Sequence, residues 1–160
     1  MIGSLLIAAT TAQLMGPWMT FSRAPAFDQR VTIVDVGTLS SNPEWHYWFR
    51  RTVRTKSASQ VWWTDTKRCP AARSVLVAAN KVPPPHIDVP GVEGPTSKGD
   101  LVITADGVGY SLDSSATYLP GHIGDRVRLS SNLGTPLAIW VDESLRTLEA
   151  CWSKEPPLEA

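Results

Sequence analysis

The sequence predicts an α+β fold: an antiparallel sheet of five or six strands with two helices packed on one face and one disulfide. Three observations support this prediction. Short runs rich in β-branched and aromatic residues, typical of strands, occur in both halves of the chain. Helical periodicity follows Pro70 and again Thr135, and the two cysteines, Cys69 and Cys151, lie beside those two helical segments.

The chain has the size and composition of one globular domain. Its 160 residues are enough to bury a core, and 42% hydrophobic with 19% charged residues is typical of a globular rather than a disordered protein. We expect residues 27–152 to form a single α+β domain. Residues 1–26 are expected to be a signal peptide or a disordered segment, and residues 153–160 a flexible tail.

Charge is balanced overall but not along the chain. Fifteen basic and fifteen acidic residues cancel, so the net charge gives no argument for a nucleic-acid partner, and none is predicted. Residues 1–81 contain ten basic and four acidic residues (+6), whereas residues 82–160 contain five and eleven (−6). This asymmetry indicates either a basic surface for an acidic partner or two halves whose charges pair or are solvated locally. The second interpretation is favoured because surface charges contribute little.

The N-terminus resembles the hydrophobic part of a secretory signal. Residues 2–9 form an apolar run, no charged residue precedes Arg23, and small residues suit cleavage after Ala12 or after Ala26. Polar residues and a Gly-Pro pair interrupt the run well short of the roughly 20 apolar residues of a membrane-spanning helix, so no stable membrane span is expected. The predicted localisation is periplasmic or secreted.

Three strands are predicted before the first helix. Residues 30–36 are β-branched and end at Gly37, whereas residues 45–54 and 60–67 are rich in aromatic residues and flank a short polar connection. The last two strands are expected to form a hairpin with Thr55 opposite Gln60. Alternation then places one set of side chains toward the core: Trp45, Tyr47, Phe49, Val53 and Trp62.

The opposite face of this hairpin is the candidate binding surface. It mixes aromatic and charged side chains: His46, Trp48, Arg50, Arg54, Trp63 and Asp65. Tryptophan rings beside arginines can stack on sugars or hold an anionic polymer through cation–π and ionic contacts. The favoured alternative is that the helices cover this face and that its tryptophans belong to the core, because large aromatic residues are usually buried.

A helix is predicted from Pro70 to about residue 79. Proline is favoured at the first helical position, and small or apolar residues then recur on one stripe: Ala71, Ala72, Val75, Leu76 and Ala79. Asn80 and the prolines at 83–85 end the helix. The Pro- and Gly-rich stretch that follows, to residue 99, is expected to be a long loop.

Two strands joined by a turn, and one further strand, are predicted in the second half. Asp106-Gly107 is a preferred two-residue hairpin turn. It would place residues 101, 103 and 105 opposite residues 112, 110 and 108. Residues 126–130 alternate in the same way and predict one more strand.

The last predicted element is a helix capped by Thr135 with Pro136 in its first turn. Cys151 ends this helix and Cys69 begins the earlier one, so a disulfide between them would suit two antiparallel helices on one face of the sheet. An alternative makes Cys69 a nucleophile at a helix start, but no Cys-His spacing supports it. The apolar side of the helix holds Leu137, Trp140, Val141, Leu145, Leu148 and Trp152.

The sequence lacks the motifs of common catalytic and cofactor sites. There is no Gly-rich phosphate loop, no nucleophile elbow and no His-Glu-x-x-His motif. His46, His86 and His122 have no metal-ligand spacing. No catalytic residue, metal site or cofactor is therefore predicted.

Three segments, residues 67–76, 106–112 and 148–152, resemble small exported proteins of proteobacteria with no assigned function. The resemblance implies export and a paired Cys69 and Cys151, and it implies no activity. The expected function is a non-enzymatic binding or structural module of the cell envelope, with a glycan, an anionic polymer or an envelope protein as partner. One alternative is an inhibitor of an envelope or secreted enzyme that inserts the loop 83–99. A second is an enzyme whose site is not visible in the sequence.

Overall fold

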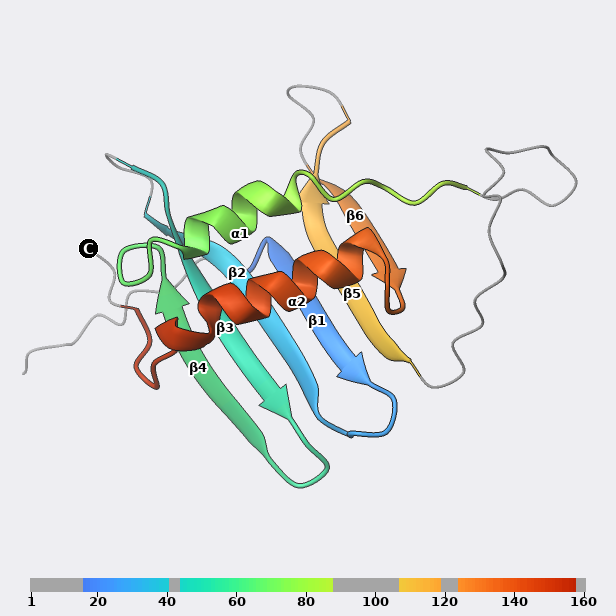
Figure 1. Ribbon diagram of the computed structural model, residues 1–160. Coiled ribbons are helices and arrows are strands. Elements are labelled where there is room, and N and C mark those ends of the chain that lie inside the picture. The colour runs from blue at the N-terminus through green and yellow to red at the C-terminus, as the bar shows by residue number, and fades with distance from the viewer. Residues whose placement is uncertain (1–15, 41–43, 88–106, 119–123, 158–160) are drawn as a thin grey trace, which may run out of the picture.

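The computed structural model describes residues 16–40, 44–87, 107–118 and 124–157. The predicted α+β architecture is confirmed: one antiparallel sheet is covered on one face by two helices (Figure 1). The elements in chain order are β1 (Met19–Pro25), β2 (Val31–Ser40), β3 (His46–Arg54), β4 (Ser59–Asp65), α1 (Ala72–Ala79), β5 (Val108–Ala116), β6 (Asp125–Ser131), α2 (Pro136–Leu148) and the short 3-10 turn η1 (Glu149–Cys151).

The strand order is β4-β3-β2-β1-β5-β6. The first four strands are joined as successive antiparallel neighbours, and β5 and β6 are added on the other side of β1. β1 is therefore the strand that joins the two halves of the sheet.

Both helices lie across the same face of the sheet and run in opposite directions (Figure 1). Thr135 caps α2 by accepting the Ala138 N–H at 3.2 Å, as the sequence predicts. The Cys69–Cys151 disulfide, with a Cα–Cα distance of 5.8 Å, ties the end of η1 to the turn before α1. Because it spans 82 positions of the chain, it contributes about 4–5 kcal/mol in the chain-entropy model.

The core lies between this face and the helices. Phe21, Val34 and Phe49 are fully buried on adjacent strands. Trp140 of α2 packs edge-on against Phe21, with ring centroids 4.9 Å apart, and its indole N–H donates to the carbonyl of Val75 in α1 at 3.1 Å. One aromatic side chain thus links both helices to the central strand.

The start of the domain differs from the prediction. Residues 19–25, expected within a signal peptide or disordered segment, form β1 at the centre of the sheet, and Phe21 has no exposed surface. The N–H of Ala26 also donates to the carbonyl of Gly107. Removal of residues up to Ala26 would delete the strand that joins the two halves, so of the two predicted cleavage points only that after Ala12 is compatible with this fold.

The hairpin predicted around Asp106-Gly107 is wrong in its pairing. Tyr110 of β5 lies opposite Arg23 of β1 on one side and Ser131 of β6 on the other. Leu112 is flanked in the same way, by Phe21 and Leu129. Both edges of β5 are therefore occupied at Tyr110 and Leu112, so the partners predicted for these two residues are wrong. Residues 101–105 lie outside the described residues.

The β3–β4 hairpin is confirmed, but its register differs from the prediction by two residues. Val53, and not Thr55, lies opposite Gln60, and the turn is closed by the Thr55 N–H donating to the Ala58 carbonyl at 2.8 Å. Because side chains alternate with a period of two, this shift keeps every residue on its predicted face. Trp45 is the exception to the predicted core, since it precedes β3 and is 56% exposed.

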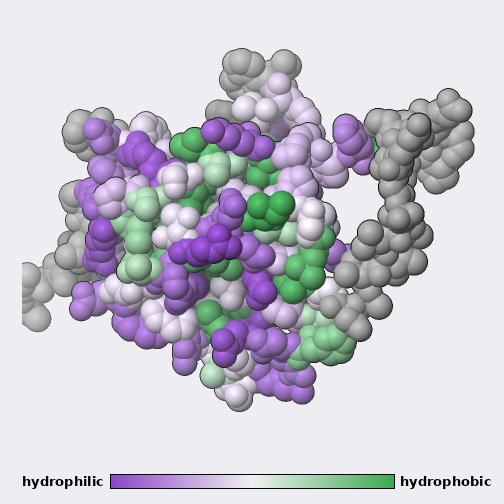
Figure 2. All heavy atoms as spheres, viewed as in Figure 1, coloured by the Kyte–Doolittle hydropathy of each residue, from purple (hydrophilic) through white to green (hydrophobic). Residues whose placement is uncertain are grey.

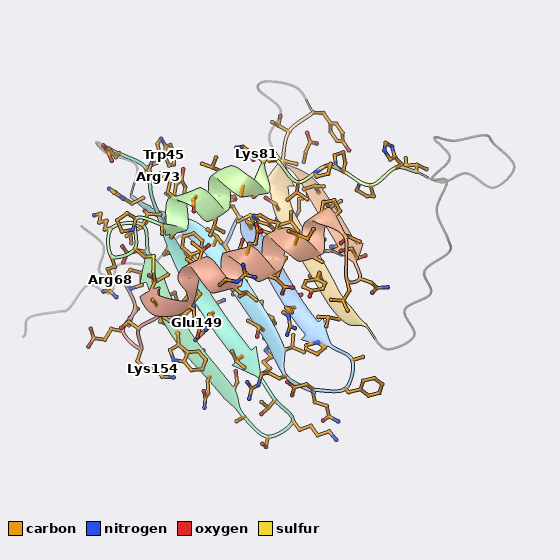
Figure 3. The ribbon with its side chains drawn as sticks, in the orientation of Figure 1. Trp45, Arg68, Arg73, Lys81, Glu149 and Lys154 are labelled. Carbon is orange, nitrogen blue, oxygen red and sulfur yellow. A yellow bond between two sulfur atoms is a disulfide. The ribbon has the colours of Figure 1, made fainter. Side chains whose placement is uncertain are left out.

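Residues 153–156, expected in a flexible tail, are held against the edge strand β4. Ser153 and Trp63 exchange backbone hydrogen bonds of 2.7 and 2.8 Å. Farther along, the Arg68 guanidinium donates to two carbonyls of the segment at 3.2 Å. Figure 3 shows Lys154 beside β4, where its ammonium lies 3.8 Å from the centre of the Trp62 ring. This pairing satisfies backbone groups that an edge strand would otherwise leave open.

Two ion pairs join the basic first half of the chain to the acidic second half. Arg23 of β1 pairs with Asp142 of α2 at 3.1 Å, and Arg51 of β3 pairs with Glu149 at 2.9 Å. The guanidinium of Arg51 also lies between two tryptophan rings, Trp62 and Trp152. Figure 2 shows hydrophilic side chains mixed with hydrophobic ones on the helix-covered side of the molecule. The two ion pairs neutralise part of the charge asymmetry between the sheet and the helical segment.

Candidate functional site

The candidate site is the face of the sheet opposite the helices. Alternation assigns even-numbered residues of β3 and odd-numbered residues of β4 to this face. Trp48, Arg50 and Trp63 therefore lie on it together, as predicted. The expectation that the helices cover these residues is wrong, because both helices pack against Phe49 and its neighbours on the other face.

Trp48 lies flat on the sheet next to Gly37 of β2. A Cβ at position 37 would overlap its six-membered ring, so this close approach requires glycine. Trp63 of β4 lies beside it with ring centroids 5.8 Å apart. Trp48 is only 3% exposed although it is not part of the helix-covered core. It therefore supports the surface and offers no ring face for a ligand.

Arg50 lies at the centre of a polar group. Its guanidinium is 5.7 Å from the centre of the Trp63 ring, and its Nε and Nη2 donate to one oxygen of Asp35 at 3.1 and 2.8 Å. The other oxygen of Asp35 accepts from the Thr20 hydroxyl at 2.8 Å. Asp35 is thus largely buried with both oxygens bonded, while the Arg50 side chain keeps 40% of its surface exposed.

A second polar group lies on the other half of the same face. Arg126 and Arg128 of β6 both donate to the carboxylate of Asp113 on β5, one to each oxygen. These bonds hold the pKa of Asp113 below its usual value, the Arg126 bonds having the larger effect. Two cations on one anion leave a positive charge, and the Arg128 side chain is 81% exposed.

Strand register places both polar groups in a single line across the sheet. Each member lies directly opposite the next on the neighbouring strand: Trp63, Arg50, Asp35, Thr20, Asp113 and Arg128. The adjacent line is made of short side chains, most of them with hydroxyls: Val61, Thr52, Ile33, Ser22, Ser111 and Ser130. Ser22 and Ser111 share a 2.7 Å hydrogen bond across β1 and β5. We call these two lines the polar face.

Two predicted site residues lie outside this arrangement. His46 shares a 3.2 Å hydrogen bond with the Thr66 hydroxyl, which also accepts the Tyr47 N–H, so the histidine helps to hold the end of the hairpin. Arg54 is exposed on the same face, four residues along β3 from Arg50. The site therefore keeps Arg50 and Trp63 as accessible groups, with Arg54 at its margin.

The sequence analysis missed the arginines of β6 and their partner Asp113. The alternation at residues 126–130 indicated a strand, but β1 was not recognised, and without it β6 has no position relative to β3. The signal that could have found β1 is the alternation of Met19, Phe21 and Arg23 with Thr20 and Ser22.

Other kinds of site find less support in the described residues. They hold no cluster of three or more His, Cys, Asp or Glu side chains placed to bind a metal. The inhibitor alternative depends on residues 83–99, of which residues 88–99 lie outside the described part of the chain. None of the described helices is long and apolar enough to cross a membrane.

No protein-family model matches the chain, and no curated protein or solved structure is detectably similar to it.

Proposed function

We propose that this chain is an exported, non-enzymatic binding module of the cell envelope and that its polar face holds an anionic polysaccharide. The single observation that carries the proposal is the line of residues from Trp63 to Arg128, which crosses the face of the sheet that the helices do not cover. The disulfide supports export, since such bonds persist in oxidising compartments.

Charge supports an anionic partner. Arg50 and Arg128 belong to the polar face, and Arg54 and Arg126 lie beside it on the same side of the sheet. These four arginines face the carboxylates of Asp35 and Asp113, while a further aspartate, Asp65, is engaged by Arg68. The bonds to Asp35 and Asp113 come from Nε and Nη2 of Arg50, Arg126 and Arg128. Among the described residues the Nη1 groups of these arginines make no hydrogen bond that would prevent them from binding a uronate or sulfate. Arginine is well suited to binding carboxylates and similar oxyanions.

The rest of the face supports a sugar rather than a protein as the ligand. Short side chains with hydroxyl groups make the surface flat and polar, and they can exchange hydrogen bonds with sugar hydroxyls. It offers few large apolar side chains of the kind that anchor protein interfaces. Trp63, at the edge of the sheet, provides one partly exposed ring for stacking.

The test measures binding of polygalacturonate, a polymer of uronic acid, by calorimetry, with neutral dextran as the comparison ligand. We expect binding of the acidic polymer only, weakened by added salt. Arg128→Gln should reduce the affinity about two- to fivefold, the effect of one exposed ion pair. Trp63→Ala should reduce it further.

Arg146→Gln is the matched control, because Arg146 is exposed on α2, away from the polar face. It should leave binding unchanged. Equal affinity for dextran and polygalacturonate, or equal losses in Arg128→Gln and Arg146→Gln, would show that the polar face is not the binding site.

A further inference from the structure

A cavity of about 500 Å³ lies between α1 and the sheet, on the face opposite the polar face. This volume is within the range, roughly 300–1,000 Å³, of small-molecule sites. The side chains that α1 buries, Ala72 and Val75, are small, and Ala79 lines the cavity together with Leu76.

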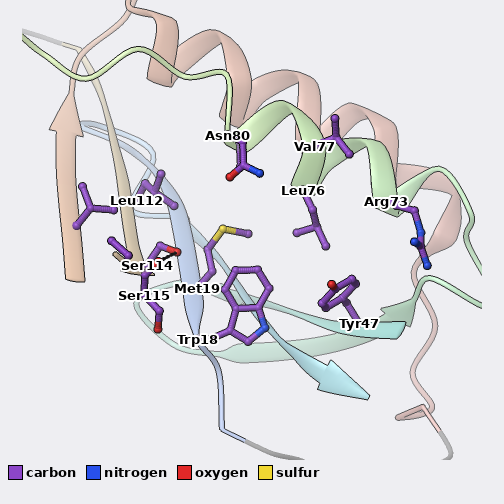
Figure 4. A pocket seen from close by; sticks show the side chains of 13 residues that line it. Trp18, Met19, Tyr47, Arg73, Leu76, Val77, Asn80, Leu112, Ser114 and Ser115 are labelled. Atoms are coloured by element: carbon purple, nitrogen blue, oxygen red, sulfur yellow. Dashed lines mark hydrogen bonds between the residues drawn. The ribbon is translucent and has the colours of Figure 1, made fainter. Parts of the chain in front are cut away.

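Most of the lining is apolar. Figure 4 shows Leu76 pointing from α1 toward Met19, Trp18 and Tyr47, with Leu112 on the opposite side. Trp18 and Tyr47 contact each other edge-on at 6.0 Å. An elongated hydrocarbon chain that enters this space would be removed from water on several sides.

One charged side chain lines the cavity. Arg73 lies at the end marked by Tyr47, whereas Asn80 lies farther along α1 (Figure 4). Arg73 donates to the carbonyl of Trp45 at 2.7 Å and pairs with no carboxylate among the described residues. Its charge is therefore available to a ligand whose apolar part fills the cavity.

We propose that this cavity binds a single-chain amphiphile with a carboxylate or similar anionic head group. The chain lies against Leu76, Met19 and Leu112, and the head group lies at Arg73. This site is separate from the polar face, since Met19 and Leu112, which line it from the sheet, belong to the helix-covered core.

The experiment measures binding of octanoate, decanoate and dodecanoate to the full chain by calorimetry, with dodecanol as the uncharged comparison. Each pair of added methylenes should strengthen binding about tenfold until the cavity is filled, since one buried methylene corresponds to about 0.8 kcal/mol. Dodecanol should bind about tenfold more weakly than dodecanoate.

Arg73→Gln should remove the preference for dodecanoate over dodecanol, whereas Arg146→Gln, the same change on the exposed side of α2, should keep it. Ala79→Leu should narrow the cavity and weaken the binding of dodecanoate, and thermal unfolding checks that this variant folds. If it does not fold, Arg73→Gln alone decides the head-group claim. Absence of binding, equal binding of dodecanol and dodecanoate by the unaltered chain, or an unchanged preference in Arg73→Gln would overturn the proposal.

Discussion

The two faces of the sheet are built from the same strands, but they shield their buried side chains from water in different ways. On the helix-covered face, Phe21, Val34 and Phe49 are buried because α1 and α2 lie over the sheet. On the polar face, Asp35 is nearly as buried, but it is enclosed by Thr20 and Arg50, which bond to it. The comparison teaches that burial in this protein indicates either a core or a satisfied polar group, and only the partners distinguish the two.

The first prediction tests whether the fold requires β1, the strand that joins the two halves of the sheet. A chain that starts at Phe27 lacks β1 and should fail to fold, because the halves β4-β3-β2 and β5-β6 then have no common neighbour. A chain that starts at Gln13 keeps β1 and should unfold cooperatively. Far-ultraviolet circular dichroism with thermal unfolding distinguishes them. A folded chain from Phe27 would show that β1 is dispensable and would restore cleavage after Ala26.

The second prediction tests whether the close contact between the Trp48 ring and Gly37 stabilises the protein. Gly37→Ala should destabilise the protein by about 1–3 kcal/mol, because the new methyl group overlaps the Trp48 ring and must displace it. Gly109→Ala on β5 is the matched control, since its methyl group would meet only the Ala24 carbonyl at 3.6 Å. Denaturant unfolding measures both. Equal losses would mean that glycine is needed for reasons other than the Trp48 contact.

The third prediction concerns stability at high pH, which depends on Tyr110 on the helix-covered face. Burial, and then the 2.8 Å hydrogen bond that Tyr110 donates to Asp142, raise the pKa of the tyrosine above its ordinary value near 10. The resulting stabilisation is complete below pH 10 and is lost as the pH rises through the folded-state pKa. Tyr110→Phe should flatten the fall of the unfolding free energy above pH 10, and an unchanged slope would contradict the prediction.

The fourth prediction, with the smallest expected effect, concerns stability at low pH, which depends on Asp113 on the polar face. Because Arg126 and Arg128 lower the pKa of Asp113, its stabilisation is present above the unfolded-state pKa near 4 and is lost as the pH falls through the folded-state pKa. Asp113→Asn should reduce the acid sensitivity of stability measured between pH 5 and 2. The same variant should leave the behaviour above pH 10 unaltered, so acid and base report on opposite faces.

Local signals predicted most of the elements. Periodicity, turn residues and capping residues, which depend on neighbouring residues alone, predicted five of the six described strands, both helices and the Thr135 cap. The cysteine pairing followed instead from the presence of just two cysteines in a chain expected to be exported. The pairing predicted for Tyr110 and Leu112 failed because a turn signal cannot show that β1 and β6 occupy the two edges of β5. β1 was missed because it begins within the uncharged N-terminal stretch, residues 1–22, that resembles a secretory signal.

For both helices and for every strand except β1, the sequence by itself determined the type of the element and the face on which its side chains lie, because a period of two or of 3.6 is a property of the local backbone. That is why the two-residue register error left Trp48, Arg50 and Trp63 together. Only the tertiary structure decided which face the helices cover, and which strands bring Arg50 and Arg128 into one line. Those choices depend on contacts between residues far apart in the chain, where β1 pairs with β5 across more than eighty positions and local periodicity carries no information.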